Sequence, residues 1–463
     1  MVTALLLAGC SEGGSSAPAT SQAPSHTPAV STTTLWPTYH LDAARSGDDT
    51  GEPSFRSLAR TWTTGPLDGA IYAEPLVDGT EVIVATENDS VYAFDTRTGA
   101  LRWHTSLGTP RTSNFPCGDV MPLGVTGTPV IAGGRIFVAA EVEAPSGVYR
   151  FRLAALNPST GATVFNDDVT PSGMDANTQQ QRSALAVSHG NVIIAWGGLF
   201  GDCGTYHGYV EAVSEQSGAA TAQWHDTPND NEGGVWSPSG PAVDGAGNIY
   251  VTTGNGANTA VSHYDYGDSV VELSPSLAVR GFFATGPPQS WASLNATDQD
   301  LGSIGPSLLT GGLLFAMGKG GRGYLLTESA LPGNSNPGGG ENAGAAVCHQ
   351  TSNAAYSGMA AAGATVYVPC ADGIAAVRID SAHAFHVLWY STSGSSAPIL
   401  AGGLVWSLHV FGGTELVGLD PATGVVVSSL TLPATTAHFA TPAAGEGRLF
   451  VAAADLLVAF AAA

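Results

Sequence analysis

Short apolar runs separated by glycine turns repeat along this chain. Each copy has a small or polar residue, a short apolar strand, a turn with glycine, and a second apolar strand. Short apolar runs bounded by turn residues predict β-strands. Eight copies occur, at residues 73–86, 127–140, 183–196, 238–253, 304–317, 357–370, 396–409 and 440–453.

The spacing of these copies predicts the fold. Strand-built copies that recur at roughly 40 to 65 residues indicate a β-propeller. A third strand and turn follow some copies, most clearly in VYAFDTRTGALRW at 91–103, where Asp95 and Gly99 suit a tight turn. The aromatic residue after that turn is expected to pack between adjacent blades. We therefore predict an all-β protein, an eight-bladed propeller of four-stranded antiparallel blades over residues 35–463.

The two ends of the repeat region predict how the ring closes. The strand SLARTWTT at 57–64 precedes the first copy, and the last copy stops after three strands. The N-terminal strand is therefore expected to complete the last blade, because closure leaves no long unpaired edge.

Composition narrows the range of partners. The chain has 463 residues, of which 15 are basic and 38 acidic, and a net charge of −23. Phosphate backbones require a basic surface, so nucleic acid and anionic membrane surfaces are excluded as partners. No later stretch is long and apolar enough to span a bilayer. We expect a monomer that meets the membrane only through a lipid anchor.

The N-terminus predicts export. LAGC at residues 7–10 matches a bacterial lipobox, so residues 1–10 read as a lipoprotein signal peptide with lipid on Cys10. The apolar region is shorter than usual, so we expect the true start to lie upstream. Residues 11–34 are rich in Ser, Thr, Ala and Pro and predict a flexible tether. The propeller is then expected on the outer face of the bacterial cell membrane.

Four further cysteines predict two disulfides. An even number in an exported protein favours pairing, and four cysteines allow three pairings. A residue just before a blade's first strand and one just after its second lie on the same face of the ring. By this rule we predict Cys117–Cys203 between neighbouring blades and Cys348–Cys370 within one. No CxxC spacing occurs, which argues against structural zinc.

The same rule collects polar side chains at one mouth of the channel, where ring-shaped folds bind ligands. Lys319 is the only lysine of the chain and lies between two glycines, so we expect it to face Glu74 or a bound anion. His207 and His438 are expected as hydrogen-bonded rim residues. The residues brought to the mouth before a first strand are Glu74, Trp236, Asp300 and His438, and those after a second strand are Asn255 and Lys319.

The repeat resembles that of pyrroloquinoline quinone (PQQ) dehydrogenases and related propellers. The pattern AxDxxTGxxxW occurs at residues 93–103, and the resemblance covers about residues 57–460. GGVWSPSGPAVDGAGNIYVTTGNG is similar to the family segment with a floor tryptophan and a metal-binding asparagine, here Trp236 and Asn255. DQDLGSIGPSLLTGGLLFAMGKGG is similar to the segment with acidic residues and a later basic residue, here Asp298 or Asp300 and Lys319.

The resemblance implies a cofactor site. PQQ would lie on Trp236, near Lys319 and the family acidic position Glu74. Calcium would be held by Asn255, by an aspartate of 298–300 and by Asp202, and Asp300 would take a proton from the substrate.

Two departures from the family pattern bear on that site. Gly118 replaces the second of two vicinal cysteines, and no glutamate stands near Leu199 to bind calcium. Either PQQ and calcium bind, or the cofactor has been lost. Two functions therefore stand open: a quinoprotein-like oxidoreductase, or a non-catalytic propeller scaffold or binding lipoprotein of the cell envelope. In the first case the substrate would be a small molecule with a hydroxyl group, and in the second case the rim would hold a small anion, a glycan or another envelope protein. The segment 332–345 is a loop that covers the mouth or a plain insertion.

Overall fold

The computed structural model describes residues 35–144, 147–260, 263–331 and 344–462. Contacts divide the chain into Met1–Val30 and Ser31–Ala463, and every described element belongs to the second unit. The predicted signal peptide, the tether and the lipidated Cys10 lie outside the described residues, as does most of the 332–345 loop. Within the described ranges, no helix has the length and hydropathy needed to cross a membrane.

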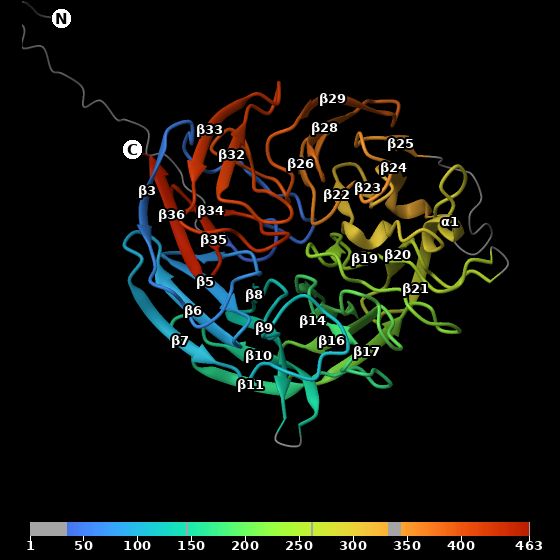
Figure 1. Ribbon diagram of the computed structural model, residues 1–463, viewed down its shortest axis with the longest axis horizontal. Helices are drawn as coiled ribbons and strands as arrows, with labels where there is room; N and C mark the ends of the chain where they lie inside the picture. The colour runs from blue at the N-terminus through green and yellow to red at the C-terminus, as the bar shows by residue number, and fades with distance from the viewer. Residues whose placement is uncertain (1–34, 145–146, 261–262, 332–343, 463) are drawn as a thin grey trace, which may run out of the picture. The chain divides into compact units, whose positions relative to one another are not determined.

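Eight antiparallel sheets follow one another around a ring, as Figure 1 shows by the progression of colour. Each sheet starts with a short inner strand and ends with an outer one. The first four blades are β4 (Leu76–Asp78), β5 (Glu81–Thr86), β6 (Ser90–Asp95) and β7 (Leu101–Ser106); β8 (Val130–Ala132), β9 (Arg135–Glu143), β10 (Tyr149–Leu156) and β11 (Thr163–Asp168); β13 (Ala186–Ser188), β14 (Asn191–Ala195), β16 (Tyr209–Ser214) and β17 (Ala220–His225); and β18 (Ala242–Val243), β19 (Ile249–Thr252), β20 (Ser269–Leu273) and β21 (Val279–Ala284).

The second half of the ring continues in the same way. Its blades are β22 (Ser307–Leu309), β23 (Leu313–Met317), β24 (Arg322–Thr327) and β25 (Ala345–Ala346); β26 (Ala360–Ala362), β27 (Thr365–Cys370), β28 (Gly373–Ile379) and β29 (Phe385–Ser391); β30 (Ile399–Ala401), β31 (Leu404–Ser407), β32 (Glu415–Leu419) and β33 (Val426–Thr431); and β34 (Ala443–Gly445), β35 (Arg448–Ala453), β36 (Leu456–Ala462) and β3 (Leu58–Thr63). The predicted eight-bladed propeller of four-stranded blades is confirmed.

The ring closes as predicted, because the N-terminal strand β3 pairs with the C-terminal strand β36, with Leu58 opposite Ala462. The remaining elements are short. They are the strands β1 (Leu35–Trp36) and β2 (Asp48–Asp49), the two-stranded ribbon of β12 (Gln179–Gln180) and β15 (Gly197–Gly198), the helix α1 (Trp291–Asn295), and the 3-10 turns η1 (Leu301–Ser303) and η2 (Glu328–Ala330).

Aromatic residues on outer strands join successive blades. Trp103 of β7 donates its indole N–H to the carbonyl of Pro158 in the turn of the next blade, at 2.7 Å. Gly161 of that turn has a φ of +68°, and a Cβ there would lie 2.4 Å from the Trp103 ring, so glycine is needed for both reasons. Trp389 packs against Gly424 in the same way. The predicted packing of this aromatic between blades is confirmed.

An N-terminal segment, not predicted from the sequence, fills the axis of the ring. Residues 35–49, here called the plug segment, extend the inner edges of two blades, since β1 pairs with β4 and β2 pairs with β30. Its carbonyls accept backbone N–H groups from inner strands of four further blades. These bonds run from Ile131 to Pro37, Val243 to Ala43, Leu308 to Ala44 and Ala361 to Ser46, at 2.7–3.1 Å.

The remaining two blades contact plug side chains. Arg45 donates to the carbonyl of Leu185 at 3.0 Å, and the His40 ring lies 3.4 Å from Thr441 Oγ1. Four residues of the segment are no more than 1% exposed: Trp36, Tyr39, His40 and Arg45. The plug segment therefore touches every blade and closes the channel along the axis.

We expect Trp36→Ala to lower the free energy of unfolding by about 3–5 kcal/mol, because a buried indole is lost from the core. The change also removes the donor that lies 2.5 Å from Glu74 Oε1. Chemical denaturation followed by circular dichroism measures the effect. Leu35→Ala is the matched control, since Leu35 is the neighbouring strand residue and is 50% exposed. Equal effects of the two changes would contradict a stabilising plug.

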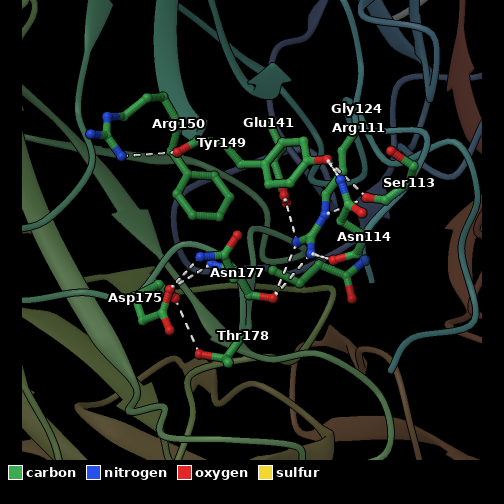
Figure 2. A network of polar contacts seen from close by, with 12 residues as sticks. Arg111, Ser113, Asn114, Gly124, Glu141, Tyr149, Arg150, Asp175, Asn177 and Thr178 are labelled. Carbon is green, nitrogen blue, oxygen red and sulfur yellow. Dashed lines mark hydrogen bonds and ion pairs between the residues drawn. The ribbon is translucent and has the colours of Figure 1, made fainter. Parts of the chain in front are cut away.

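A buried arginine fixes the loop between blades 1 and 2. Arg111 donates to Glu141 Oε1 at 3.1 Å and to the carbonyls of Asn114 and Asn177, as Figure 2 shows. Its guanidinium also lies 4.3 Å from the centre of the Tyr149 ring. These contacts hold the loop that carries Cys117 against blade 2.

Two more carboxyl groups are buried beside this network. Glu87 accepts a hydrogen bond from the backbone N–H of Gly124 at 2.8 Å. Neither carboxyl oxygen of Asp89 has a hydrogen-bond partner in the described part of the chain. Burial, and then the charges of Glu87 and Glu141, raise the pKa of Asp89 to about 9. Burial likewise raises the pKa of Glu87 to about 7 and that of Glu141, against the opposing effect of Arg111, to about 8.

Asp89→Asn is expected to stabilise the protein at alkaline pH. The Asp89 carboxyl stays protonated in the folded state up to about pH 9, whereas in the unfolded chain it ionises near pH 4. Its cost to stability therefore grows as the pH rises from about 4 to about 9. Urea unfolding at pH 5 and pH 8.5 should show the larger gain, at least about 1 kcal/mol, at pH 8.5. Asp167→Asn on β11 is an exposed control, and an equal gain at both pH values would refute the prediction.

Candidate functional site

A cavity of about 390 Å3 opens on the face of the ring that carries the residues flanking the first two strands of each blade. We call it the funnel. Its charged lining residues are Asp119, Arg182, Asp202, Asp298, Asp300 and Lys319. Its aromatic lining residues are Phe200, Tyr206, Trp236, Tyr356, Phe411 and Phe439. A cavity of this size, with charged and polar groups set among aromatic walls, suits a small polar organic ligand.

Most of the residues predicted for the site meet in the funnel. The lining includes Trp236, Asn255, Asp298, Asp300 and Lys319, and also Asp202. They meet because the segment before β22 and the segment after β23 run side by side, and the N–H of Lys319 donates to the carbonyl of Asp300 at 2.9 Å. The matching offset in blade 4 brings Asn255 and Trp236 to the same place.

Lys319 binds two carboxylates. Its Nζ lies 2.8 Å from Asp298 Oδ1 and 2.5 Å from Asp300 Oδ2, and 5.5 Å from the centre of the Trp236 ring. The side chains of Lys319 and Asp300 are 12% and 5% exposed, whereas that of Asp298 is 65% exposed. The ammonium group is thus held at the floor of the funnel by a buried ion pair.

Asp300 is the most heavily bonded of these groups. Its Oδ1 accepts the backbone N–H of Asn255 at 2.9 Å and faces the indole N–H of Trp236 at 3.4 Å. With the Asn255 amide nitrogen turned toward it, that nitrogen lies 2.5 Å from Oδ1 and 3.0 Å from Oδ2. Gly254 makes this approach possible, because a Cβ there would lie 2.5 Å from Asp300 Oδ1.

The aspartates around Lys319 have pKa values shifted in opposite directions. Burial would raise the pKa of Asp300, but the charge and hydrogen bond of Lys319, with the hydrogen bond from Asn255, lower it. Burial and the charge of Asp300 raise the pKa of Asp298 and of the neighbouring Asp268. Asp300 is therefore the carboxyl group that stays ionised, whereas protonation is favoured at Asp298 and Asp268.

The predicted pairing of Glu74 with Lys319 is wrong. Glu74 is buried beneath the funnel, where its carboxyl group accepts from the Trp36 indole and from the backbone N–H of His40. Burial raises the pKa of Glu74 well above its usual range, although these donors and Arg45 oppose the shift. The Glu74 carboxyl group is therefore hydrogen-bonded to the plug segment, and Glu74 is not among the residues that line the funnel.

The residues predicted to bind calcium line the funnel, but their oxygen atoms are not arranged around a common ion position. Asp202 accepts a hydrogen bond from the Tyr206 hydroxyl at 2.8 Å, and the Lys319 ammonium stands between Asp298 and Asp300. Among the described residues, no group of three or more His, Cys, Asp or Glu side chains is arranged to hold a metal ion. Leu199 is buried in the funnel wall, near the position where the family pattern has a calcium-binding glutamate.

Both predicted disulfides are confirmed. Cys117–Cys203 joins the loop before β8 to the loop after β15, with Cα atoms 6.1 Å apart. Cys348–Cys370 joins the segment after β25 to the end of β27. Two disulfides indicate an oxidising, extracytoplasmic compartment. The first one fixes residues 199–202, all of which line the funnel.

Replacing Cys117 and Cys203 by serine is expected to cost about 2–4 kcal/mol of stability. This pair spans 86 residues and the Cys348–Cys370 pair spans 22, so the first double variant should lose more than the second. Thermal melts of both double-serine variants test the order. A larger loss from the shorter span would contradict the loop-entropy explanation.

The repeat pattern did not reveal Arg182, Asp119 and the aromatic wall. Arg182 follows the β12 strand, which pairs with β15 outside the blade pattern, and its side chain lies 3.7 Å from Asp119. The CGDV segment was the only signal for Asp119. His438 lies in the funnel as expected, and His207 lies outside it with its Nδ1 2.8 Å from Thr227 Oγ1.

Comparison with known proteins supports the fold. Residues 48–200 match the family model described as outer membrane protein assembly factor BamB. No curated protein sequence matches this chain significantly.

Solved structures match most of the chain at low identity. Quinohemoprotein alcohol dehydrogenase from Comamonas testosteroni aligns with a TM-score of 0.69 and 17% identity, over 92% of this chain and 80% of that one. A europium-containing methanol dehydrogenase aligns at 0.65 and 15%, over 92% and 98%. BamB from Moraxella catarrhalis aligns at 0.57 and 13%, over 87% and 99%. The resemblance to PQQ-repeat propellers is confirmed for the repeat and the fold.

Proposed function

We propose that this protein is an extracytoplasmic oxidoreductase of the quinoprotein type, which holds a planar quinone cofactor on Trp236 and oxidises a small hydroxyl compound in the funnel. The observation that carries the proposal is the grouping of Asp300, Lys319 and Trp236. A buried, charged carboxylate next to an indole in a ligand-sized cavity suits a catalytic base.

The residues present fit such a cofactor better than they fit calcium. Trp236 offers an aromatic surface with Lys319 above it, and Asn255 lies beside the carboxylate. Lysine is a donor for quinone or carboxylate oxygens. Calcium requires six to eight oxygen ligands, and the Lys319 ammonium occupies the space between the two nearest carboxylates. We therefore propose PQQ as the cofactor, with Asn255, Asp298 and Asp202 as the metal ligands only if Lys319 moves.

A quinone supplies two-electron oxidation of an alcohol when it is bound. Asp300 would accept the hydroxyl proton of the substrate, because Lys319 and Asn255 hold its carboxyl group in the deprotonated form that a base needs. Lys319 would stabilise that charge before transfer and orient the carboxylate. The aromatic wall, with Tyr356 and Phe439, would exclude water from the reacting atoms.

A second function is favoured by a different observation. Phe200 and Phe411 line the funnel and are each 66% exposed. Met121, which follows Cys117 closely in the sequence, is 69% exposed. Exposed large apolar side chains are typical of binding surfaces. With the BamB family match of residues 48–200, they support the alternative of a non-catalytic envelope scaffold or binding lipoprotein anchored through Cys10.

Titration of the purified protein with PQQ, with and without calcium, tests the first function. We expect quenching of tryptophan fluorescence, lost in Trp236→Ala, and binding about tenfold to a hundredfold weaker in Lys319→Ala, because a charged hydrogen bond is removed. Trp389→Phe on the outer strand β29 is the control that should keep the quenching. Melting curves show whether each variant is folded.

Dye-linked alcohol oxidation by the loaded protein then tests catalysis. Asp300→Asn should keep cofactor binding and lose about two to four orders of magnitude in turnover, since the base is removed. Absence of binding at saturating PQQ and calcium would exclude the oxidoreductase and leave the envelope scaffold.

A further inference from the structure

A smaller cavity continues the funnel toward the axis of the ring. It has a volume of about 20 Å3 and shares Arg182, His438 and Phe439 with the funnel lining. Tyr72 lines it, and Tyr39 of the plug segment forms part of its wall. A space of this size holds one small group, such as a carboxylate oxygen or a water molecule.

Arg182 offers unused donors to these cavities. Its side chain is 11% exposed, and its Nη2 donates to Gln180 Oε1 at 3.2 Å and lies 3.7 Å from Asp119 Oδ1. The face of the guanidinium lies 5.3 Å from the centre of the Phe439 ring. In the described part of the chain, Nη2 is the one guanidinium nitrogen of Arg182 with a hydrogen-bond partner, so the N–H groups of Nε and Nη1 stay free for a ligand. Free guanidinium N–H groups form charged hydrogen bonds with carboxylate oxygens.

Two tyrosine hydroxyls at the small cavity are also potential donors. Tyr39 is 1% exposed, and its hydroxyl is buried without a hydrogen-bond partner among the described residues. Burial raises the pKa of Tyr39, and burial followed by the charges of Glu87 and Asp119 raises the pKa of Tyr72 to about 12. Both hydroxyls therefore keep their protons at neutral pH. Burial, then Arg182, lowers the pKa of His438 to about 4, so this ring is neutral.

The two cations of the funnel, Lys319 and Arg182, differ in how far neighbouring carboxylates compensate their charge. Lys319 is bound by two carboxylates at 2.5–2.8 Å, so its charge is compensated. Among the described residues Arg182 forms an ion pair with Asp119 alone, whose side chain is 35% exposed and which His438 also approaches at 3.8 Å. Glu87 is the other acid that acts on Arg182, and burial raises its own pKa to about 7. An anion that enters the funnel therefore meets its strongest partner at Arg182.

We propose that Arg182, with the hydroxyls of Tyr39 and Tyr72, forms a carboxylate-binding subsite at the base of the funnel. The ligand class is a small organic acid that also carries hydroxyl groups, with its acid end at Arg182 and the rest of the molecule in the funnel. The subsite rests on the funnel being a ligand site, as proposed above, but not on a cofactor. A carboxylate of the bound cofactor is the second source of the same chemistry.

Titration calorimetry of the cofactor-free protein with matched acid and neutral compounds tests the subsite. The pairs are gluconate with glucitol and glycolate with ethylene glycol, which differ in the carboxylate. We expect at least one acid to bind and its neutral partner to bind at least tenfold more weakly. Arg182→Ala should weaken acid binding about tenfold to a hundredfold, because a charged hydrogen bond is lost. Tyr39→Phe should weaken it by a smaller factor, and Asp119→Asn should strengthen it.

Arg102→Ala is the matched control, since Arg102 is exposed on β7 and pairs with Asp95 away from the funnel. Arg182→Lys, which keeps the charge, guards against a variant that fails to fold and should recover part of the affinity. If neither acid binds but Arg182→Ala weakens PQQ binding, the subsite stands and the carboxylate belongs to the cofactor. If Arg182→Ala changes neither acid binding nor PQQ binding, or if acids and neutral compounds bind alike, the subsite is refuted. Acid binding without PQQ binding would refute the proposed oxidoreductase and keep the subsite.

Discussion

The structure depends on how the axis of the ring is filled. Inner strands of eight blades converge on that axis. The backbone N–H and C=O groups on their axis-facing edges need hydrogen-bond partners once they are buried. The plug segment supplies them, blade by blade, from a single stretch of residues 35–49. Glu74 belongs to this arrangement, because its buried carboxyl group is tied to Trp36 and His40. The base of the funnel is thus built by the N-terminal segment as well as by the blades.

The repeating part of the molecule could be predicted from the sequence because each blade uses the same rule. Inner strand, glycine turn and second strand recur, so a residue's offset within a copy fixes its face of the ring. That rule was enough to bring Trp236, Asn255, Asp300 and Lys319 together and to pair Cys117 with Cys203. Gly254 adds the local reason, since only glycine lets Asn255 and Asp300 approach.

The non-repeating parts could not be predicted, because no internal copy shows where they go. The plug segment is a single stretch whose partners are spread over the whole chain. Its presence changes the role of Glu74, which the offset rule had placed at the mouth with Lys319. Arg182 escaped notice for the same reason, as it follows a short ribbon outside the blade pattern. In each case the partner is set by tertiary contacts, which no local pattern of residues encodes.

The plug segment also has a consequence for how the chain folds. Residues 35–49 precede every blade in the sequence, yet their partners include Leu400 and Thr441 near the other end. The ring itself closes between Leu58 and Ala462. Contacts of such long sequence separation form late and make folding slow. Residues 35–49 are synthesised before every blade and are nevertheless among the last to reach their places, so Trp36 and Tyr39 stay exposed until the ring has formed.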